Sequence, residues 1–189
     1  MYSELDIQSA LQTLRSGGII LYPTDTIWGI GCDATNEVAV QKIYELKQRP
    51  DHKSMIVLLA TERDLLQYIA APDMEVFNYL DSVTKPTTII YDGALGLADN
   101  LLGADGSIGI RIVKDEFCKH LIKRLGKPLV STSANLSGKP SPQVYLEIDP
   151  VIKAGVDYQV QYRQNDNSPK QPSSIVKWNK DASVTIIRP

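Results

Sequence analysis

The sequence predicts an α/β domain built on a mixed sheet, and three observations support this fold class. Short apolar or β-branched segments alternate along the chain with segments whose apolar residues recur at helical spacing. Some strand candidates are separated by a helix and others are not, so both parallel and antiparallel neighbours are expected. No repeat or low-complexity segment interrupts the 189 residues, a length that suits one domain. We therefore expect a single domain over residues 1–189, with a mixed sheet rather than a simple doubly wound one.

Helices are predicted wherever apolar residues recur three and four positions apart. The first helix should end at Gly17, because glycine is favoured just beyond a helix C-terminus. The second should end at Pro50, since proline cannot continue a helix. Thr61 suits an N-cap position and is followed three residues later by Asp64. The five predicted helices span residues 5–14, 38–46, 61–69, 73–83 and 115–125.

Strands are predicted where apolar or β-branched residues follow one another without helical spacing. The seven predicted strands span residues 19–22, 55–59, 87–91, 107–113, 129–133, 174–178 and 184–188. A polar segment that contains proline, residues 162–172, is expected to form a mobile surface loop.

The composition excludes several classes of protein. With 20 basic and 22 acidic residues and 43% hydrophobic residues, the chain is neither generally disordered nor a histone-like binder of nucleic acid, although a local basic patch is compatible with this balance. The longest apolar runs, such as 55–60, fall far short of the roughly 20 residues that span a bilayer, and the polar N-terminus differs from a signal or transit peptide. Cys32, Cys118, His52 and His120 are too dispersed to indicate a disulfide framework or a His/Cys metal centre. We expect a soluble protein of the reducing cytoplasm.

The most informative segment is residues 128–142, PLVSTSANLSGKPSP, in which an apolar strand runs into short polar side chains. Ligands of α/β sheets bind beyond the carboxyl ends of strands, and in an extended chain Ser133 and Asn135 face the same side. A helix N-cap or an Asx-turn is the alternative explanation. Because no G-x-S-x-G motif is present and neither histidine is placed as a base, Ser133 is expected to bind rather than to act as a nucleophile.

Three cations follow one another where the second predicted helix ends: Lys47, Arg49 and Lys53. They can simply complement the negative end of the helix dipole, an effect of about 0.3–1 kcal/mol. They can also form a cationic cluster that holds a polyphosphate, with arginine as a planar fork and lysine as a point charge. No Walker A motif is present, so a nucleotide would be held by dispersed groups.

The strand SIGIRI at residues 107–112 alternates between two faces. Its isoleucines share one face, whereas Ser107, Gly109 and Arg111 share the other. This second face either lines a ligand cleft, which Gly109 lets the ligand approach, or is an exposed strand face.

Two further features have simpler alternatives. Residues 22–31, YPTDTIWGIG, form either a turn after a strand or a loop in which Asp25 helps to hold a divalent cation through water, a role that Asp33 can share. Residues 111–127 carry six basic side chains, and helical spacing places Lys119 and Lys123 on one face. That face is either solvated or a footprint for RNA.

Seven segments in this order resemble the YrdC family, the L-threonylcarbamoyl-adenylate synthases of tRNA modification. They are spread over nearly the whole chain and are YPTDTIWGIGCDA (22–34), KQRP (47–50), KPTTII (85–90), SIGIRI (107–112), PLVSTSANLSGKPSP (128–142), PSSIV (172–176) and IIRP (186–189). The resemblance implies a twisted open sheet around a large, positively lined cavity. It also implies a short, single-domain enzyme that joins L-threonine, bicarbonate and ATP into threonylcarbamoyl-AMP and pyrophosphate.

By the same resemblance, the family's K-x-R and S-x-N tetrad falls on Lys47, Arg49, Ser133 and Asn135, which are the implied catalytic residues. The implied contacts to threonine are Thr26, Arg111, Ser133 and one of Ser173 and Ser174. The implied contacts to ATP are Arg49, Lys53, Ser107, Asn135, Gln143 and Arg188. Magnesium is expected to accompany ATP, no metal is expected to be held by the protein, and the product is expected to pass to a tRNA threonylcarbamoyl transferase complex.

The chain departs from the family pattern in three places, and in one of them the segment before Thr87 lacks the usual Pro-Gly. Trp28 stands where the family usually has tyrosine, and Leu58 stands where many members have a histidine near the threonine. Two alternatives from other functional classes are a module that binds double-stranded RNA or tRNA in the same basic cavity, and a carbamoyl-adenylating enzyme with another acceptor. Binding of RNA would depend on salt and not on threonine. The absence of a zinc-finger or acylphosphatase segment from this sequence argues against the second alternative.

Overall fold

The computed structural model describes residues 2–48 and 55–189, in which nine strands form one mixed sheet. The sheet has the order β7-β1-β2-β6-β3-β5-β4-β8-β9. Three neighbouring pairs, β1 with β7, β3 with β5 and β4 with β8, are parallel, and the other pairs are antiparallel. The predicted mixed α/β class is therefore confirmed. The single-domain boundaries at residues 1 and 189 stay a prediction.

The seven predicted strands are present with bounds within one residue of those predicted, and two further strands join them. Their bounds are β1 Ile20–Tyr22, β2 Gly29–Gly31, β3 Ile56–Leu59, β4 Thr87–Tyr91, β5 Ile108–Ile112, β6 Leu129–Ser133, β7 Tyr158–Gln159, β8 Ser174–Trp178 and β9 Val184–Arg188. Strand β2 falls inside the segment expected to be a loop, and β7 was not predicted. Both are too short to show an alternating pattern.

The helices are α1 Glu4–Arg15, α2 Glu37–Lys47, α3 Leu65–Tyr68, α4 Glu75–Ser82, α5 Glu116–Leu125 and α6 Pro150–Gly155. Helix α2 ends at Lys47 and is capped by Gln48, which adopts a left-handed conformation with φ of 50°, whereas Pro50 lies outside the described residues. The predicted helix 61–69 is instead a 3₁₀ turn, Glu62–Asp64, followed by α3, and its Thr61 backbone N–H donates to Asp64 at 2.8 Å. Helix α6 was not predicted.

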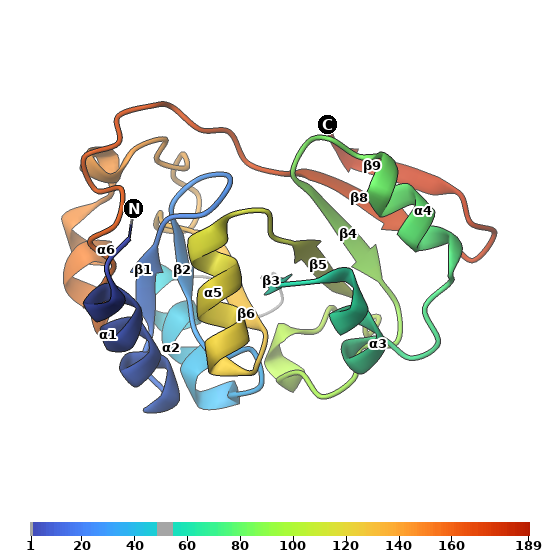
Figure 1. The fold of residues 1–189 in the computed structure, drawn as a ribbon, viewed down its shortest axis with the longest axis horizontal. Helices are drawn as coiled ribbons and strands as arrows, with labels where there is room; N and C mark the ends of the chain where they lie inside the picture. The colour runs from blue at the N-terminus through green and yellow to red at the C-terminus, as the bar shows by residue number, and fades with distance from the viewer. Residues whose placement is uncertain (1, 49–54) are drawn as a thin grey trace.

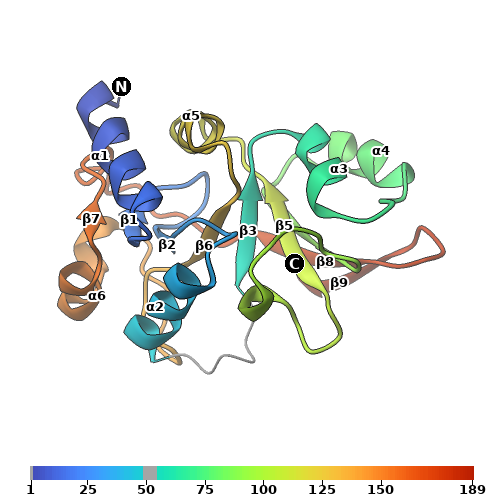
Figure 2. The ribbon, with the colours of Figure 1, turned by 90° about the horizontal axis from the view of Figure 1, so that it is seen from below.

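Alternation along the strands separates two cores. On one face Val57, Ile110 and Val130 pack with residues of α2, α3 and α4. On the other face Leu58 and Leu129 pack with residues of α1 and α5. Figure 1 shows α5 in front of the middle strands, and Figure 2 shows α1, α2 and α6 beside the β1 end of the sheet and α3 and α4 beside the β4 end.

The second face is covered only in part by α1 and α5. Beyond these helices it continues as Ile56, Arg111, Ser131 and Ser133, which line a cavity. The segment after β7 crosses from the α6 side of the molecule to β8 (Figure 1). Within residues 2–48 and 55–189, no helix combines the length and the apolar character needed to cross a membrane.

Candidate active site

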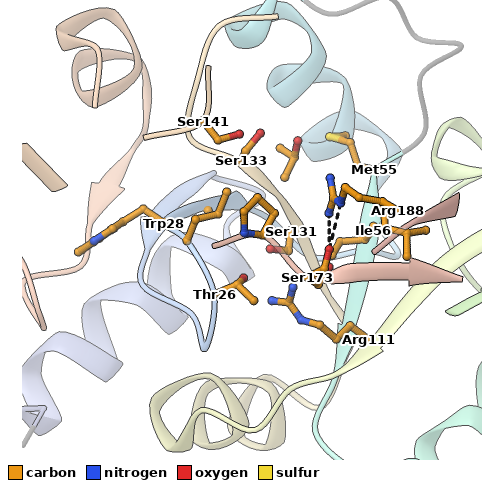
Figure 3. Close-up of a pocket in the computed structure, with 15 residues that line it drawn as sticks. Thr26, Trp28, Met55, Ile56, Arg111, Ser131, Ser133, Ser141, Ser173 and Arg188 are labelled. Atoms are coloured by element: carbon orange, nitrogen blue, oxygen red, sulfur yellow. Dashed lines mark hydrogen bonds between the residues drawn. The ribbon is translucent and has the colours of Figure 1, made fainter. Parts of the chain in front are cut away.

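A cavity of about 210 Å³ lies where these elements meet. Its walls come from the loop before β2, the start of β3, β5, the end of β6, and the segments that lead into β8 and end β9 (Figure 3). Its lining residues are Thr26, Ile27, Trp28, Gly29, Met55, Ile56, Arg111, Ser131, Thr132, Ser133, Ser141, Pro172, Ser173, Ile175 and Arg188. Of the lining residues that the structure describes, the charged ones are both arginines.

Close packing of the β1–β2 hairpin on β6 brings the loop before β2 to the cavity. A Cβ atom on Gly31 would lie 2.4 Å from the carbonyl oxygen of Val130 and 2.6 Å from the Tyr22 ring. No side chain fits there, so this position requires glycine. The Tyr22 hydroxyl donates to the same carbonyl at 2.9 Å.

At one end of the cavity, Lys47 holds the turn that follows β6. This last residue of α2 is 1% exposed, and its ammonium donates to the carbonyl oxygens of Ser133 and Asn135, the latter at 2.5 Å. The backbone N–H of Ser137 donates back to the Lys47 carbonyl at 2.9 Å. A buried ammonium needs such partners, and here they fix the course of the chain after β6.

Ser133 and Asn135 are not equivalent in this turn. The backbone N–H of Asn135 donates to the Ser133 carbonyl at 2.9 Å, so the chain is tightly turned rather than extended. Ser133 lines the cavity. The Asn135 amide instead donates to the carbonyls of Leu136 at 3.0 Å and Lys139 at 2.6 Å. Within the described part of the chain, its buried Oδ1 atom has no hydrogen-bond partner.

At the other end of the cavity, Arg111 is only 3% exposed. Its Nη2 atom lies 3.1 Å from Oδ1 of Asp25, close enough for an ion pair but not aligned as a hydrogen bond. Nε and Nη2 of Arg111 therefore have no hydrogen-bond partner among the residues that the structure describes. The other Asp25 oxygen accepts from the backbone N–H of Lys114 at 3.0 Å.

The environment of β5 decides between the two explanations of its second face. Because Arg111 is buried and lines the cavity, the exposed strand face is excluded. The role expected for Gly109 stays a prediction. A Cβ atom there would lie 3.2 Å from Ile56 and 3.3 Å from Thr88, so the glycine also allows side chains from the neighbouring strands to pack.

Arg188 and Ser173 form the wall between these two ends. The Nε and Nη2 atoms of Arg188 donate to the Ser173 carbonyl at 3.0 and 2.7 Å, as the dashed lines in Figure 3 show. The Ser173 hydroxyl shares a 2.8 Å hydrogen bond with that of Thr88. Burial and the charge of Arg111 lower the pKa of Arg188. The positive charges of Arg111 and Arg188 repel each other beside one cavity, and an anion bound there would reduce this repulsion.

Thr26 lines the cavity from the loop before β2 and is 6% exposed. Its hydroxyl lies 2.9 Å from the hydroxyl of Thr24. Figure 3 shows Thr26 and Arg111 at one end of the cavity and Ser133 and Ser141 at the other. The structure therefore brings Thr26, Arg111, Ser133, Ser173 and Arg188 together around one space.

The other predicted site residues lie outside this lining. Ser174 lines a neighbouring groove of about 310 Å³ that also includes Arg188, and Gln143 lines a small pocket that shares Thr26 and Trp28 with the cavity. The Ser107 hydroxyl donates to Asp105 at 2.6 Å, and this hydrogen bond lowers the pKa of that carboxyl group. Arg49 and Lys53 lie outside the described residues.

Several lining residues were not predicted. Ser131 precedes Ser133 by two positions on the same strand face, so alternation along β6 was a signal for it. Ser141 comes from a loop that only the tertiary fold brings back. Trp28 is 5% exposed and its ring centroid lies 5.0 Å from that of Tyr145. Leu58, by contrast, is fully buried in the core under α1 and α5 and does not line the cavity.

The carboxylates suggested for a divalent cation have other partners. Asp33 accepts from the backbone N–H and hydroxyl of Thr35 at 2.8 and 2.7 Å and from Lys127 at 2.8 Å. Asp25 faces Arg111 and Lys114. Over residues 2–48 and 55–189, no three His, Cys, Asp or Glu side chains lie together as metal ligands would.

Comparison with known proteins decides the family. The Sua5/YciO/YrdC family model, described as "Telomere recombination", matches residues 12–189. The chain belongs to this family. A threonylcarbamoyl-AMP synthase of Stenotrophomonas maltophilia is 39% identical over 150 residues, 78% of this chain and 81% of that protein. One of Idiomarina loihiensis is 38% identical over 156 residues, 81% of this chain and 84% of that protein.

Solved structures of family members have the same fold. Sua5 of P. abyssi, in a complex with L-threonine, matches with a TM-score of 0.87 and 22% identity. The match covers 99% of this chain but only 54% of Sua5. YciO of E. coli matches with a TM-score of 0.84 and 23% identity, and the match covers 98% of this chain and 89% of YciO. The expected twisted open sheet of this family is confirmed.

Proposed function

We propose that this protein is an L-threonylcarbamoyladenylate synthase. In this reaction L-threonine, bicarbonate and ATP form threonylcarbamoyl-AMP and pyrophosphate, and the adenylate serves the threonylcarbamoyl modification of tRNA. The proposal is supported by curated relatives named threonylcarbamoyl-AMP synthase at 38–39% identity over most of both chains. It is also supported by the structural match to a Sua5 complexed with L-threonine.

The observation that carries the proposal is the arrangement of Arg111. A buried guanidinium with unused donors is costly, because each unpaired buried donor loses its hydration without compensation. Its Nε and Nη2 atoms have no hydrogen-bond partner in the described chain, although Asp25 lies 3.1 Å away. Nε and one Nη atom of a guanidinium form a fork that matches a carboxylate. We assign this fork to the carboxylate of the amino acid.

The remaining threonine contacts come from the lining of the same cavity. We assign them to Thr26, Ser133 and Ser173, which line the cavity with Arg111. Of the two adjacent serines suggested by the resemblance, Ser173 is the better candidate, since Ser174 lines the neighbouring groove instead.

The nucleotide is assigned to the remaining polar groups around the cavity. Arg188 lines the cavity, and Gln143 lines the small pocket that shares Thr26 and Trp28 with it. Asn135 follows the cavity residue Ser133 in the turn after β6. Ser107 lies just before β5, roughly 13 Å along the extended chain from Arg111 at about 3.3 Å per residue. Arg49 and Lys53 complete the proposed ATP contacts. Magnesium would enter with ATP, and we propose no metal site made by the protein alone.

Lys47 is proposed to act through the turn after β6. Its ammonium donates to the carbonyls of Ser133 and Asn135, so its charge stabilises the conformation that places both residues. Together with Arg49 these residues form the proposed catalytic group.

The reaction requires cations that stabilise the negatively charged reactants, and it needs no covalent intermediate with the protein. The threonine amine attacks bicarbonate, a C–N bond forms and water leaves, giving a carbamate. A carbamate oxygen then attacks the α-phosphorus of ATP and pyrophosphate departs. Fixed cations and positioned reactants supply most of the rate acceleration in such reactions. We propose that Arg49, Arg111 and Arg188 supply the charges and that the partly covered cavity protects the carbamate from water.

A role as an RNA-binding module is not favoured. The expected basic face of α5 contains Lys119, which pairs with Glu116 at 3.4 Å. A link to tRNA through a small adenylate needs no RNA-binding surface, and we propose that a tRNA threonylcarbamoyl transferase complex takes the product. Because ATP and tRNA meet in the cytoplasm, we propose that location.

The direct test is incubation of the purified protein with ATP, magnesium, L-threonine and ¹³C-bicarbonate, followed by mass spectrometry. We expect a threonylcarbamoyl-AMP ion that carries one ¹³C atom and an equal amount of pyrophosphate. Omission of threonine or bicarbonate should abolish both products. Absence of the adenylate, together with salt-dependent RNA binding that threonine does not alter, would support the RNA-binding alternative.

A further inference from the structure

The hydroxyl of Thr24 lies in the loop before β2, just behind the residue that lines the cavity. Thr24 is 3% exposed. Its Oγ1 atom lies 2.8 Å from the carbonyl oxygen of Ile27, 3.0 Å from the backbone nitrogen of Thr26 and 2.9 Å from Oγ1 of Thr26. Three partners are as many as one hydroxyl group can serve.

The direction of each of these hydrogen bonds can be worked out. A hydroxyl has one proton and two lone pairs. The Ile27 carbonyl can only accept, so it takes the Thr24 proton. The Thr26 backbone N–H can only donate, so it occupies one Thr24 lone pair. The Thr26 hydroxyl is then left with the second lone pair, to which it must donate its own proton.

The loop that holds Thr24 is restrained from several sides. The Cys118 thiol donates to the Pro23 carbonyl at 3.2 Å. Arg163 donates to the Thr24 carbonyl at 3.3 Å and forms an ion pair with Asp115 at 2.8 Å. These contacts come from α5 and from the segment after β7, so the loop cannot shift to give Thr24 other partners without breaking them.

We propose that Thr24 is a positioning residue that directs the Thr26 hydroxyl proton away from the cavity, so that Thr26 presents only acceptor lone pairs to the amino acid substrate. This inference rests on the proposed function. Thr26 lines the cavity, and its lone pairs can accept only from an N–H or O–H group. Carboxylate and phosphate oxygens, which only accept, are excluded from this position.

This acceptor complements Arg111, whose unused groups only donate. Both residues line the same cavity (Figure 3). An amino acid therefore binds with its carboxylate on Arg111 and a donor group on Thr26, and the reverse orientation is disfavoured. If the donor is the amine, one N–H remains after the C–N bond to bicarbonate carbon forms and water leaves, so the same acceptor serves both the amine and the carbamate.

A double-mutant cycle tests the inference. Thr24→Val should raise the KM for L-threonine about tenfold, the factor for one lost hydrogen bond, and leave the KM for ATP within about twofold. Thr26→Val should raise the KM for L-threonine at least as much. If Thr24 acts through Thr26, the double variant should resemble Thr26→Val alone, whereas independent effects would multiply.

Matched variants separate positioning from a general loss of structure. Thr24→Ser keeps the hydroxyl and should restore the KM for L-threonine. Thr13→Val removes a hydroxyl that donates to the Ser9 carbonyl within α1 and should leave both KM values unchanged. If Thr24→Val does not fold, Thr24→Cys, a weaker donor of similar size, takes its place in the same cycle.

The source of the donor is distinguished with L-2-aminobutyrate, which lacks the threonine hydroxyl, used as a competitor. Equal weakening of threonine and aminobutyrate by Thr24→Val assigns the donor to the amine, and weakening of threonine alone assigns it to the hydroxyl. Multiplying penalties in the cycle, or an unchanged KM for L-threonine in Thr24→Val, would overturn the inference while wild-type turnover still supports the proposed function. A wild-type protein that neither forms the adenylate nor binds L-threonine would overturn both.

Discussion

The buried cations at the two ends of the cavity differ in their hydrogen-bond partners. At the β6 end, the Lys47 ammonium is satisfied by backbone carbonyls of Ser133 and Asn135. At the β5 end, Arg111 has one carboxylate neighbour, Asp25, and donors without a hydrogen-bond partner among the described residues. A buried cation that is satisfied internally stabilises the fold, whereas one with unused donors awaits a ligand. Substitution at the two ends should therefore have opposite signatures in stability and in substrate binding.

The largest effect on stability is expected at the β6 end. Lys47→Met removes the buried ammonium and leaves the carbonyls of Ser133 and Asn135 without this donor, so the free energy of unfolding should fall by about 3 kcal/mol or more. Urea denaturation measures this. Lys119→Met, which breaks an exposed ion pair with Glu116, is the control and should cost under about 0.5 kcal/mol. A loss under about 1 kcal/mol for Lys47→Met would mean that Lys47 does not hold the turn.

The β5 end should respond in the opposite way. Arg111→Lys keeps a positive charge beside Asp25 but loses the planar fork, so stability should change by less than about 1 kcal/mol while kcat/KM for L-threonine falls about 100-fold. Steady-state kinetics with varied L-threonine, beside urea denaturation, measure both. Arg124→Lys, on the surface beside Glu4, should match the wild type. A large loss of stability with unchanged threonine kinetics would remove the contrast between the two ends.

Arg188 sharpens the comparison because it shares features of both ends. It donates to the Ser173 carbonyl, yet burial and the charge of Arg111 lower its pKa. Arg188→Gln should raise the KM for ATP about tenfold, as expected for one lost charge-assisted contact, and change the KM for L-threonine by less than about threefold. Kinetics with each substrate varied in turn separate these constants. An effect confined to threonine would place Arg188 in the amino acid subsite instead.

The smallest effect concerns Cys118, whose thiol holds the Pro23 carbonyl at the Arg111 end. Burial, and secondly the charge of Asp115, raise the pKa of the Cys118 thiol well above its usual value. The unfolded thiol ionises above about pH 8.5 while the folded one stays neutral, so stability is lost as the pH rises above that value. Between pH 8.5 and 10, the free energy of unfolding of Cys118→Ala should therefore fall by about 1.6 kcal/mol less in total than that of the wild type.

Urea denaturation at pH 8, 9 and 10 compares the two proteins. Cys32, which is also buried and whose pKa burial also raises, contributes equally to both and cancels in the difference. Parallel pH dependences would show that Cys118 ionises as readily in the folded protein as in the unfolded one.

Much of the fold was predictable because alternation and helical spacing are local properties. In β5, alternation along the strand is enough to place the isoleucines and Arg111 on opposite faces. Arg111 is then buried because β3 and β4 flank the strand. Strand β2 was not predictable in this way, because Gly29 and Gly31 have no side chains to show a pattern. Both positions are glycine because β6 packs too closely against them for a side chain, and this contact is a tertiary one.

The residue types of the candidate site could be predicted from the sequence, whereas the directions in which their side chains point could not. The segment that contains Ser133 and Asn135 marks a polar turn after a strand, but the sequence does not show that Asn135 turns into its own loop. Lys47 similarly stood out as a cation, whereas its orientation toward two carbonyls depends on where β6 lies relative to α2. Such directions are set by contacts between residues far apart in the chain. The residues of the Lys47–Asn135 hydrogen bond, for example, are 88 positions apart.

A crystal structure of the protein with L-threonine tests the central claim most directly. We predict that the carboxylate of the amino acid lies within hydrogen-bond distance of Nε and Nη2 of Arg111, with its amine or hydroxyl directed at Thr26. A carboxylate bound instead at the Ser133 end, or threonine bound outside the cavity, would contradict the division of the site into a satisfied end and a binding end.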